Sequence, residues 1–154
     1  MIFAAAILIL LLLFVLIKWL LREKPFPYER RELLSENERM LYEILREIAE
    51  EKDLLLLMKM RLADIMQVQK GTKEYMKFFN RIKAKHTDFI LCDPDTLEVL
   101  MGIELDDESH KREDRIERDE FVDAAYAVCG IPLLHVWNPI TLEELREYID
   151  EELG

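Results

Sequence analysis

Hydrophobic and polar positions divide the chain into one long apolar run and a series of shorter, patterned segments. Residues 2–17 carry no polar side chain. Further along, apolar residues recur with the helical period after two capping boxes, Ser35–Glu38 and Thr141–Glu144. Short apolar or alternating runs between them are typical of strands. This order predicts an α/β fold, in which a mixed β-sheet is flanked by helices.

The expected elements follow one another as helix, strand, hairpin, helix, strand and helix. We predict helices over 35–52, 73–82, 113–129 and 141–153, and strands over 54–60, 87–92, 97–106 and 132–137. A short helix or turn is expected at 62–68, and the sequence Asp93-Pro94-Asp95-Thr96 is a turn signal inside the hairpin. The crossover through helix 113–129 predicts that the last two strands are parallel.

The N-terminal apolar run is predicted to be an uncleaved transmembrane anchor. About 20 apolar residues cross a bilayer, Lys18 can extend to the interface, and Trp19 suits it. A cleaved signal peptide would need a basic start and a cleavage site, and neither is present. We assign residues 1–21 to the anchor, 22–34 to a juxtamembrane linker and 35–154 to one domain. Basic residues after the run place that domain on the cytoplasmic side.

Charge is distributed unevenly along the chain. The net charge is −11, which argues against a general nucleic-acid binder. Basic side chains nevertheless concentrate in 70–85, where six of them face a single acid, Glu74. This segment, which includes Lys83, is either a solvated helix face or a wall that faces phosphate. Cys92 and Cys129 have no metal-ligand spacing, and we expect both to be buried in a reducing compartment.

Three carboxylates are expected to meet at one edge of the hairpin. Asp88 lies near the start of its first strand, and Glu104 and Asp106 lie on one face at the end of the second. Carboxylates this close repel one another unless a hard cation lies among them. Two interpretations follow from the residues alone: a divalent-metal site of the kind nucleases use, or solvated strand ends.

Some residues outside the hairpin are candidates for the same site. Helix 113–129 should direct Arg115 and Arg118 back toward the carboxylates, where Arg118 either contacts phosphate or pairs with an acid. Glu38 either approaches the site from its helix or, as we expect, only caps that helix, and His135 is interpreted as a packed strand residue.

Three segments resemble a known family. They are LLSENERMLYEIL, HTDFILCDPDTLEVLMGIELDDESH and RDEFVDAAYAVCGIPLLHV, and they resemble the bacterial domain-of-unknown-function family 2726 (DUF2726) over about 33–137. The order of elements and acids also resembles the PD-(D/E)XK restriction-endonuclease-like fold, and DUF2726 is similar to very-short-patch-repair-type endonucleases. The membrane of a bacterial member would be the inner membrane, crossed once.

The resemblance implies roles for individual residues. Asp88 and Glu104 match the two motif acids and would bind Mg²⁺, which activates a water and neutralises the scissile phosphate. The lysine usually found two residues later is Asp106 here, which would be a further metal ligand or a general base. Lys85 or Lys111 would then supply the missing positive charge, and His110 would transfer protons.

Two functions are consistent with these expectations. The first is a membrane-anchored, cytoplasmic nuclease-like domain that hydrolyses the phosphodiester bonds of DNA with Mg²⁺. The alternative is a non-catalytic nuclease-like module that tethers a protein or nucleic-acid partner at the inner membrane.

Overall fold

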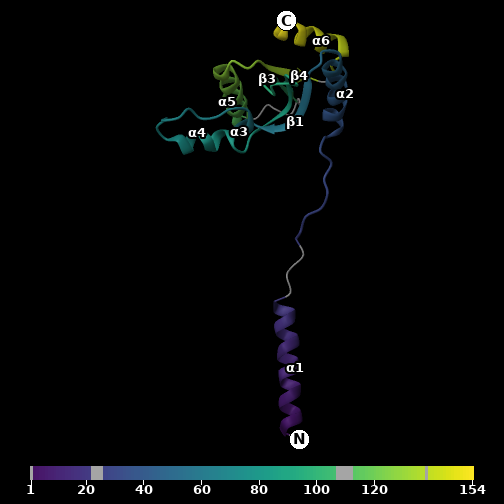
Figure 1. Ribbon diagram of the computed structural model, residues 1–154, viewed down its shortest axis with the longest axis vertical. Coiled ribbons are helices and arrows are strands. Elements are labelled where there is room, and N and C mark those ends of the chain that lie inside the picture. The colour runs from purple at the N-terminus through teal and green to yellow at the C-terminus, as the bar shows by residue number, and fades with distance from the viewer. Residues whose placement is uncertain (1, 22–25, 107–112, 138) are drawn as a thin grey trace. The chain divides into compact units, whose positions relative to one another are not determined.

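The computed structural model describes residues 2–21, 26–106, 113–137 and 139–154, except for the side chains of residues 2, 4, 5, 8 and 113–119 (Figure 1). The chain forms two compact units, Met1–Leu33 and Leu34–Gly154.

The first unit contains helix α1 (Ile2–Leu20), and its described residues 26–33 form neither helix nor strand. Among the described residues, no helix combines the length and the apolar character needed to cross a membrane. The predicted transmembrane anchor is therefore wrong, and so is the predicted single-pass location in the bacterial inner membrane with a cytoplasmic C-terminal domain.

The second unit is an α/β structure built on a four-stranded mixed sheet in the order β1-β2-β3-β4. The strands are β1 (Leu55–Arg61), β2 (His86–Cys92), β3 (Val99–Asp106) and β4 (Leu133–Trp137). Neighbouring strands are antiparallel from β1 to β3, whereas β3 and β4 are parallel. The expected hairpin and the expected parallel crossover are therefore both present.

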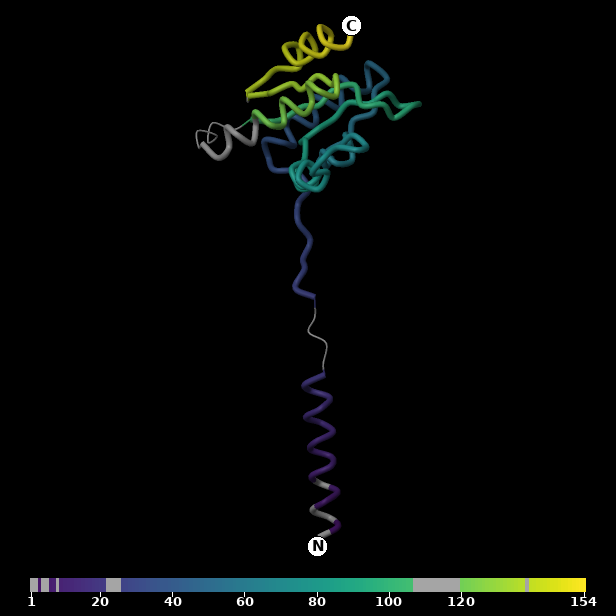
Figure 2. The backbone as a smooth tube through the Cα atoms, turned by 90° about the vertical axis from the view of Figure 1, so that its left-hand side faces the viewer, coloured from purple at the N-terminus to yellow at the C-terminus, as the bar shows by residue number. Residues whose placement is uncertain are grey.

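Helices cover both faces of this sheet (Figure 1). One face carries α2 (Glu36–Glu51) and α6 (Leu142–Leu153), and the other carries α3 (Leu62–Ile65), α4 (Tyr75–Ile82) and α5 (Glu113–Cys129). The capping boxes at Ser35 and Thr141 start α2 and α6, as their sequences predict. Figure 2 shows α6, in yellow, as an outer element of the unit.

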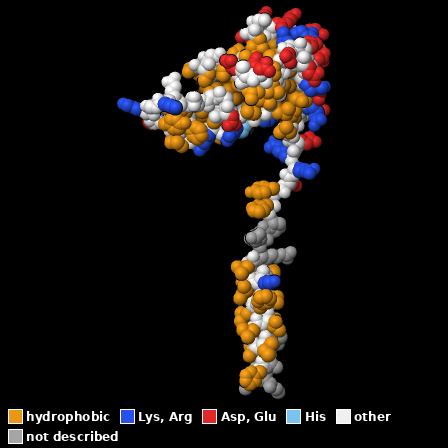
Figure 3. Space-filling model, viewed as in Figure 1, with side chains coloured by type: hydrophobic (Ala, Val, Ile, Leu, Met, Phe, Trp, Pro, Cys, Tyr) orange, Lys and Arg blue, Asp and Glu red, His pale blue; other side chains and the backbone are white. Residues whose placement is uncertain are grey.

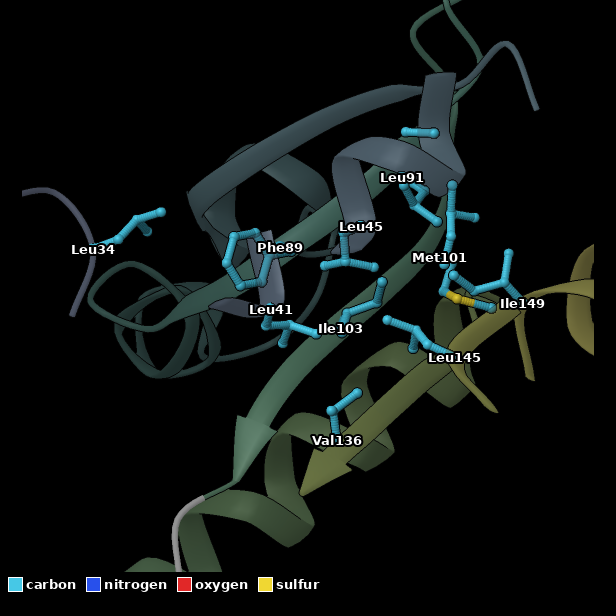
Figure 4. Packing of buried hydrophobic residues seen from close by; sticks show 12 residues of the cluster. Leu34, Leu41, Leu45, Phe89, Leu91, Met101, Ile103, Val136, Leu145 and Ile149 are labelled. Carbon is cyan, nitrogen blue, oxygen red and sulfur yellow. The ribbon is translucent and has the colours of Figure 1, made fainter. Parts of the chain in front are cut away.

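The larger hydrophobic core lies between the sheet and helices α2 and α6 (Figure 4). Leu41, Leu45 and Ile48 recur at helical spacing on α2 and are fully buried. They pack in one cluster with Phe89 and Ile103, which point from β2 and β3 toward the same face. Burying such a side chain stabilises the fold by about 1.5–3 kcal/mol. This packing fixes α2 against β1 and β2, where the candidate site lies.

A smaller core on the opposite face depends on the absence of a side chain at Gly102. A Cβ atom there would lie 2.6 Å from Cε1 of Tyr126 and 2.9 Å from Cδ1 of Leu133, so only glycine lets α5 approach β3 this closely. The Tyr126 hydroxyl lies 2.5 Å from Oγ1 of the buried Thr87, which satisfies both groups.

Two local expectations were wrong. Helix α4 begins at Tyr75 and not at residue 73, because Glu74 before it has a φ of 57° and a ψ of 35°, in the left-handed region. Cys129 is exposed at the last residue of α5, whereas Cys92 is buried as expected.

Candidate functional site

The centre of the candidate site is an ammonium group held between two carboxylates. Nζ of Lys59, on β1, donates to Oδ1 of Asp88 on β2 at 2.6 Å and also to Oε1 of Glu38 on α2. The Lys59 side chain is 29% exposed, and the two acidic side chains are 19% exposed. We call these three residues the Lys59 cluster. It is open enough to meet a ligand and buried enough for its charges to interact strongly.

Strand pairing explains why these residues meet. The backbone pairs Met58↔Phe89 and Met60↔Thr87 flank Lys59 and place it opposite Asp88. Lys59 itself has a φ of 54°, in the left-handed region that non-glycine residues rarely adopt. This conformation costs about 1–2 kcal/mol. The contacts of the ammonium group with two carboxylates offset that cost.

Asp88 also replaces part of the backbone ladder between β2 and β3. Its Oδ2 accepts a hydrogen bond from the N–H of Leu105 at 3.1 Å. The recorded backbone pairing of β2 with β3 ends at Phe89↔Ile103, whereas β3 continues to pair with β4 as far as Asp106↔Trp137. The Asp88 carboxylate is thereby fixed between β1 and β3, with one oxygen on each side.

The charges of the cluster support one another. Burial alone would lower the pKa of Lys59, but its hydrogen bonds to Asp88 and Glu38 outweigh burial and raise that pKa. Burial alone would raise the pKa of Glu38, but hydrogen bonds from Lys59 and Ser35 lower it. Glu38 therefore belongs both to the Lys59 cluster and to the capping box of α2. Its Oε1 contacts Lys59, and its Oε2 accepts a hydrogen bond from the backbone N–H of Ser35 at 2.6 Å.

A second group of charges lies where β3, β4 and α5 meet. Nδ1 of His135 is 2.8 Å from Oδ2 of Asp106, and Nε2 is 2.9 Å from Oδ1 of Asp123. Burial alone would lower the pKa of His135, yet its hydrogen bonds to Asp123 and Asp106 raise it. We call this the His135 cluster. Contact of both ring nitrogens with carboxylates favours the doubly protonated, charged ring.

Glu104 belongs to the α5 side of the sheet. It lies opposite His135 in the parallel register of β3 and β4. Its charge also contributes to the pKa of Tyr126, which burial, the largest cause, raises to about 12. The three acids expected to converge are therefore divided: Asp88 joins the Lys59 cluster and Asp106 the His135 cluster. Within the described residues, no group of three or more His, Cys, Asp or Glu side chains could hold a metal ion.

The structure describes some of the other predicted site residues and not others. Nζ of Lys85 lies 5.6 Å from the ring centroid of Phe121. Lys83 is exposed at the C-cap of α4. His110 and Lys111 lie outside the described residues, as do the side chains of Arg115 and Arg118, although these two belong to α5.

The cation beside Asp88 is thus Lys59, which is not among the site residues predicted from the sequence. The sequence does contain a sign that Lys59 is special, because it is the only charged residue in the apolar run 54–60. His135 was missed for a related reason: a histidine in a strand gives no sign of its cross-strand neighbours.

Comparison with known proteins places the chain in a family. A sequence model described as "Protein of unknown function (DUF2726)" matches residues 30–153. No curated protein matches the chain. No solved structure matches it either. The matched range includes both charged clusters, and this chain therefore belongs to the DUF2726 family of proteins of unknown function.

Proposed function

We propose that the second unit is a nuclease-like domain that acts on the phosphodiester backbone of DNA, with a core related to PD-(D/E)XK and very-short-patch-repair-type endonucleases. One observation carries the proposal: Lys59 brings a positive charge to Asp88, 2.6 Å from its carboxylate. The motif position for that charge is occupied by Asp106, so a lysine from a different strand would supply it.

The charged groups of the cluster have chemistry suited to this reaction. The Lys59 ammonium would neutralise charge on a phosphate oxygen after exchanging one carboxylate for it, which stabilises the charge that develops in the transition state. The raised pKa of Lys59 keeps it charged, and the lowered pKa of Glu38 keeps that acid ionised. An ionised carboxylate of the cluster would accept a proton from the attacking water.

A preformed magnesium site does not fit the described residues. Their donor type is suitable, because carboxylate oxygens are the protein ligands that Mg²⁺ prefers. Their arrangement is not, because Asp88 already contacts Lys59 and the Leu105 N–H, and Asp106 contacts His135. No three-ligand group occurs in the part of the chain that the structure describes. We therefore assign the proposed roles to the side chains alone.

A second candidate is a nuclease-like module that binds nucleic acid without cutting it. The same contacts favour it, because Asp88 is fully engaged in holding β1 and β3 together. In this case Lys59 would be a structural cation, and the fold would be retained for binding.

Cleavage and binding assays on the full chain separate these candidates. Labelled DNA is incubated with EDTA or with Mg²⁺, and products and bound fractions are measured for wild type and Lys59→Met. Loss of a group that stabilises the transition state lowers a rate by about 10²–10³-fold. Lys52→Met is the matched control, because its side chain is also 29% exposed and pairs with an acid, Asp150, on α6.

The outcomes are distinct. Cleavage by wild type and Lys52→Met, with loss in Lys59→Met, supports the nuclease. Binding without cleavage under every condition supports the second candidate. Neither binding nor cleavage by a folded wild-type chain refutes both.

A further inference from the structure

Helix α4 carries an aromatic surface that the core does not cover. Its apolar stripe consists of residues 75, 78, 79 and 82, at helical spacing. Ile82 is buried, and Phe79 packs against the smaller core. Tyr75 and Phe78 are 43% and 42% exposed, and the adjacent Met76 is 59% exposed. We call Tyr75, Met76 and Phe78 the α4 surface, and it is the part of the stripe that extends past the core.

Neighbouring contacts hold this surface in place. The rings of Tyr75 and Phe79 are stacked, with centroids 6.2 Å apart and planes inclined by 13°. At the other end of the helix, the guanidinium of Arg81 lies 3.8 Å from the centroid of Phe121 on α5. The exposed rings are therefore attached to the domain by an ordered aromatic and cationic contact.

Basic side chains surround the α4 surface, although the protein as a whole is acidic. Between Lys70 and Lys85 six basic side chains face one acid, Glu74, although the chain carries a net charge of −11. Figure 3 shows apolar and basic side chains together over α4, and acidic side chains gathered over α2 and α6. A ligand that complements the α4 surface is consequently anionic and offers flat apolar groups.

We infer that the α4 surface binds single-stranded nucleic acid, with bases stacked on Tyr75 and Phe78 and phosphates near the basic side chains. Rings of this kind bind unpaired bases, since the faces of paired bases are covered within a duplex. An anionic membrane fits less well, because α4 has only eight residues, about 12 Å, and cannot lay a broad apolar face in the headgroup layer. The inference rests on the proposed function and narrows its substrate to DNA with an unpaired segment.

Fluorescence anisotropy of a labelled oligothymidylate tests this inference. The full chain is titrated in EDTA, and gel electrophoresis of the label after each titration establishes that the oligonucleotide is still intact. Tyr75→Ala and Phe78→Ala should each weaken binding about tenfold, because each removes a stacking ring. Tyr75→Phe should bind like wild type. Tyr148→Ala is the matched control, because Tyr148 is 51% exposed on the acidic helix α6, and its loss should change nothing.

A salt titration adds an independent readout. Lys77→Gln should reduce the dependence of log affinity on log salt by about 0.7, the value of one phosphate contact on a single strand. Circular dichroism melting of each variant establishes that α4 and the domain remain folded.

Several results would overturn the inference. They are equal binding by wild type and both alanine variants, equal affinity for a matched duplex, or preferential binding to phosphatidylglycerol vesicles over the oligonucleotide. Failure of the proposed function looks different. A chain that binds the oligonucleotide through Tyr75 and Phe78 but never cleaves supports the inference and refutes the nuclease, whereas cleavage unaffected by Tyr75→Ala refutes the inference alone.

Discussion

Replacement of Lys59 by methionine removes the cation from between two carboxylates and leaves the backbone conformation as it is. Breaking a fully buried ion pair costs about 3–5 kcal/mol, and losing an exposed one costs about 0–1 kcal/mol. The Lys59 side chain is 29% exposed and its partners 19%, so the cost lies between these limits, at about 2 kcal/mol. For a unit of this size that lowers Tm by about 8 °C.

A double-mutant cycle assigns this loss to the cluster. Glu38→Gln retains the capping box, because glutamine also accepts from the Ser35 N–H. Lys59→Met and Glu38→Gln together should therefore cost about 1 kcal/mol less than the sum of the single changes. Urea unfolding followed by circular dichroism measures all four proteins, and Lys52→Met serves as the control with a more exposed partner, Asp150.

The pH dependence supplies a second check on the same residues. The pKa of Glu38 is lower in the folded protein than its ordinary value of 4.5. Ionised Glu38 therefore stabilises the fold at a pH above 4.5, and this contribution is lost as the pH falls through the folded-state pKa. The difference between wild type and Lys59→Met should shrink over that range. Equal destabilisation by Lys59→Met and Lys52→Met, or strict additivity in the cycle, would refute the reasoning.

Further predictions concern the α5 side of the sheet. The pKa of His135 is raised above its ordinary value of 6.5, so the charged ring stabilises the fold at a pH below 6.5, and this contribution is lost as the pH rises through the folded-state pKa. In urea unfolding measured at several pH values, His135→Asn should make the free energy of unfolding depend less on pH. Gly102→Ala should lower the free energy of unfolding by about 1–3 kcal/mol, because the new methyl group would overlap the Tyr126 ring. Thr87→Val should cost about 1–3 kcal/mol in the same assay by leaving the Tyr126 hydroxyl unpaired, and an unchanged midpoint would contradict the reasoning.

Local sequence signals predicted the regular elements well. The capping boxes at Ser35 and Thr141 start helices, and Gly130 follows the last residue of α5. The hairpin turn forms as its sequence indicates, with Oδ1 of Asp93 accepting from the backbone N–H groups of Asp95 and Thr96. Each of these features depends on residues within a few positions of one another, which is why a single sequence reveals them.

The candidate site was harder to predict, because long-range pairing decides it. The alternation rule places Glu104 and Asp106 on one face, but it does not reveal that Asp88 turns toward β1 and α2. The contact between Lys59 and Asp88 joins residues 29 positions apart and requires a left-handed residue inside a strand. The position of His135 between two acids follows from the parallel register of β4, which local sequence does not encode.

The bond between the Asp88 carboxylate and the Leu105 N–H bears on how relatives of this chain are interpreted. A residue that completes the sheet is needed for folding whether or not the protein cuts DNA. An aspartate at this position in a relative is therefore no sign of catalytic activity, because an inactive member would lose stability without it.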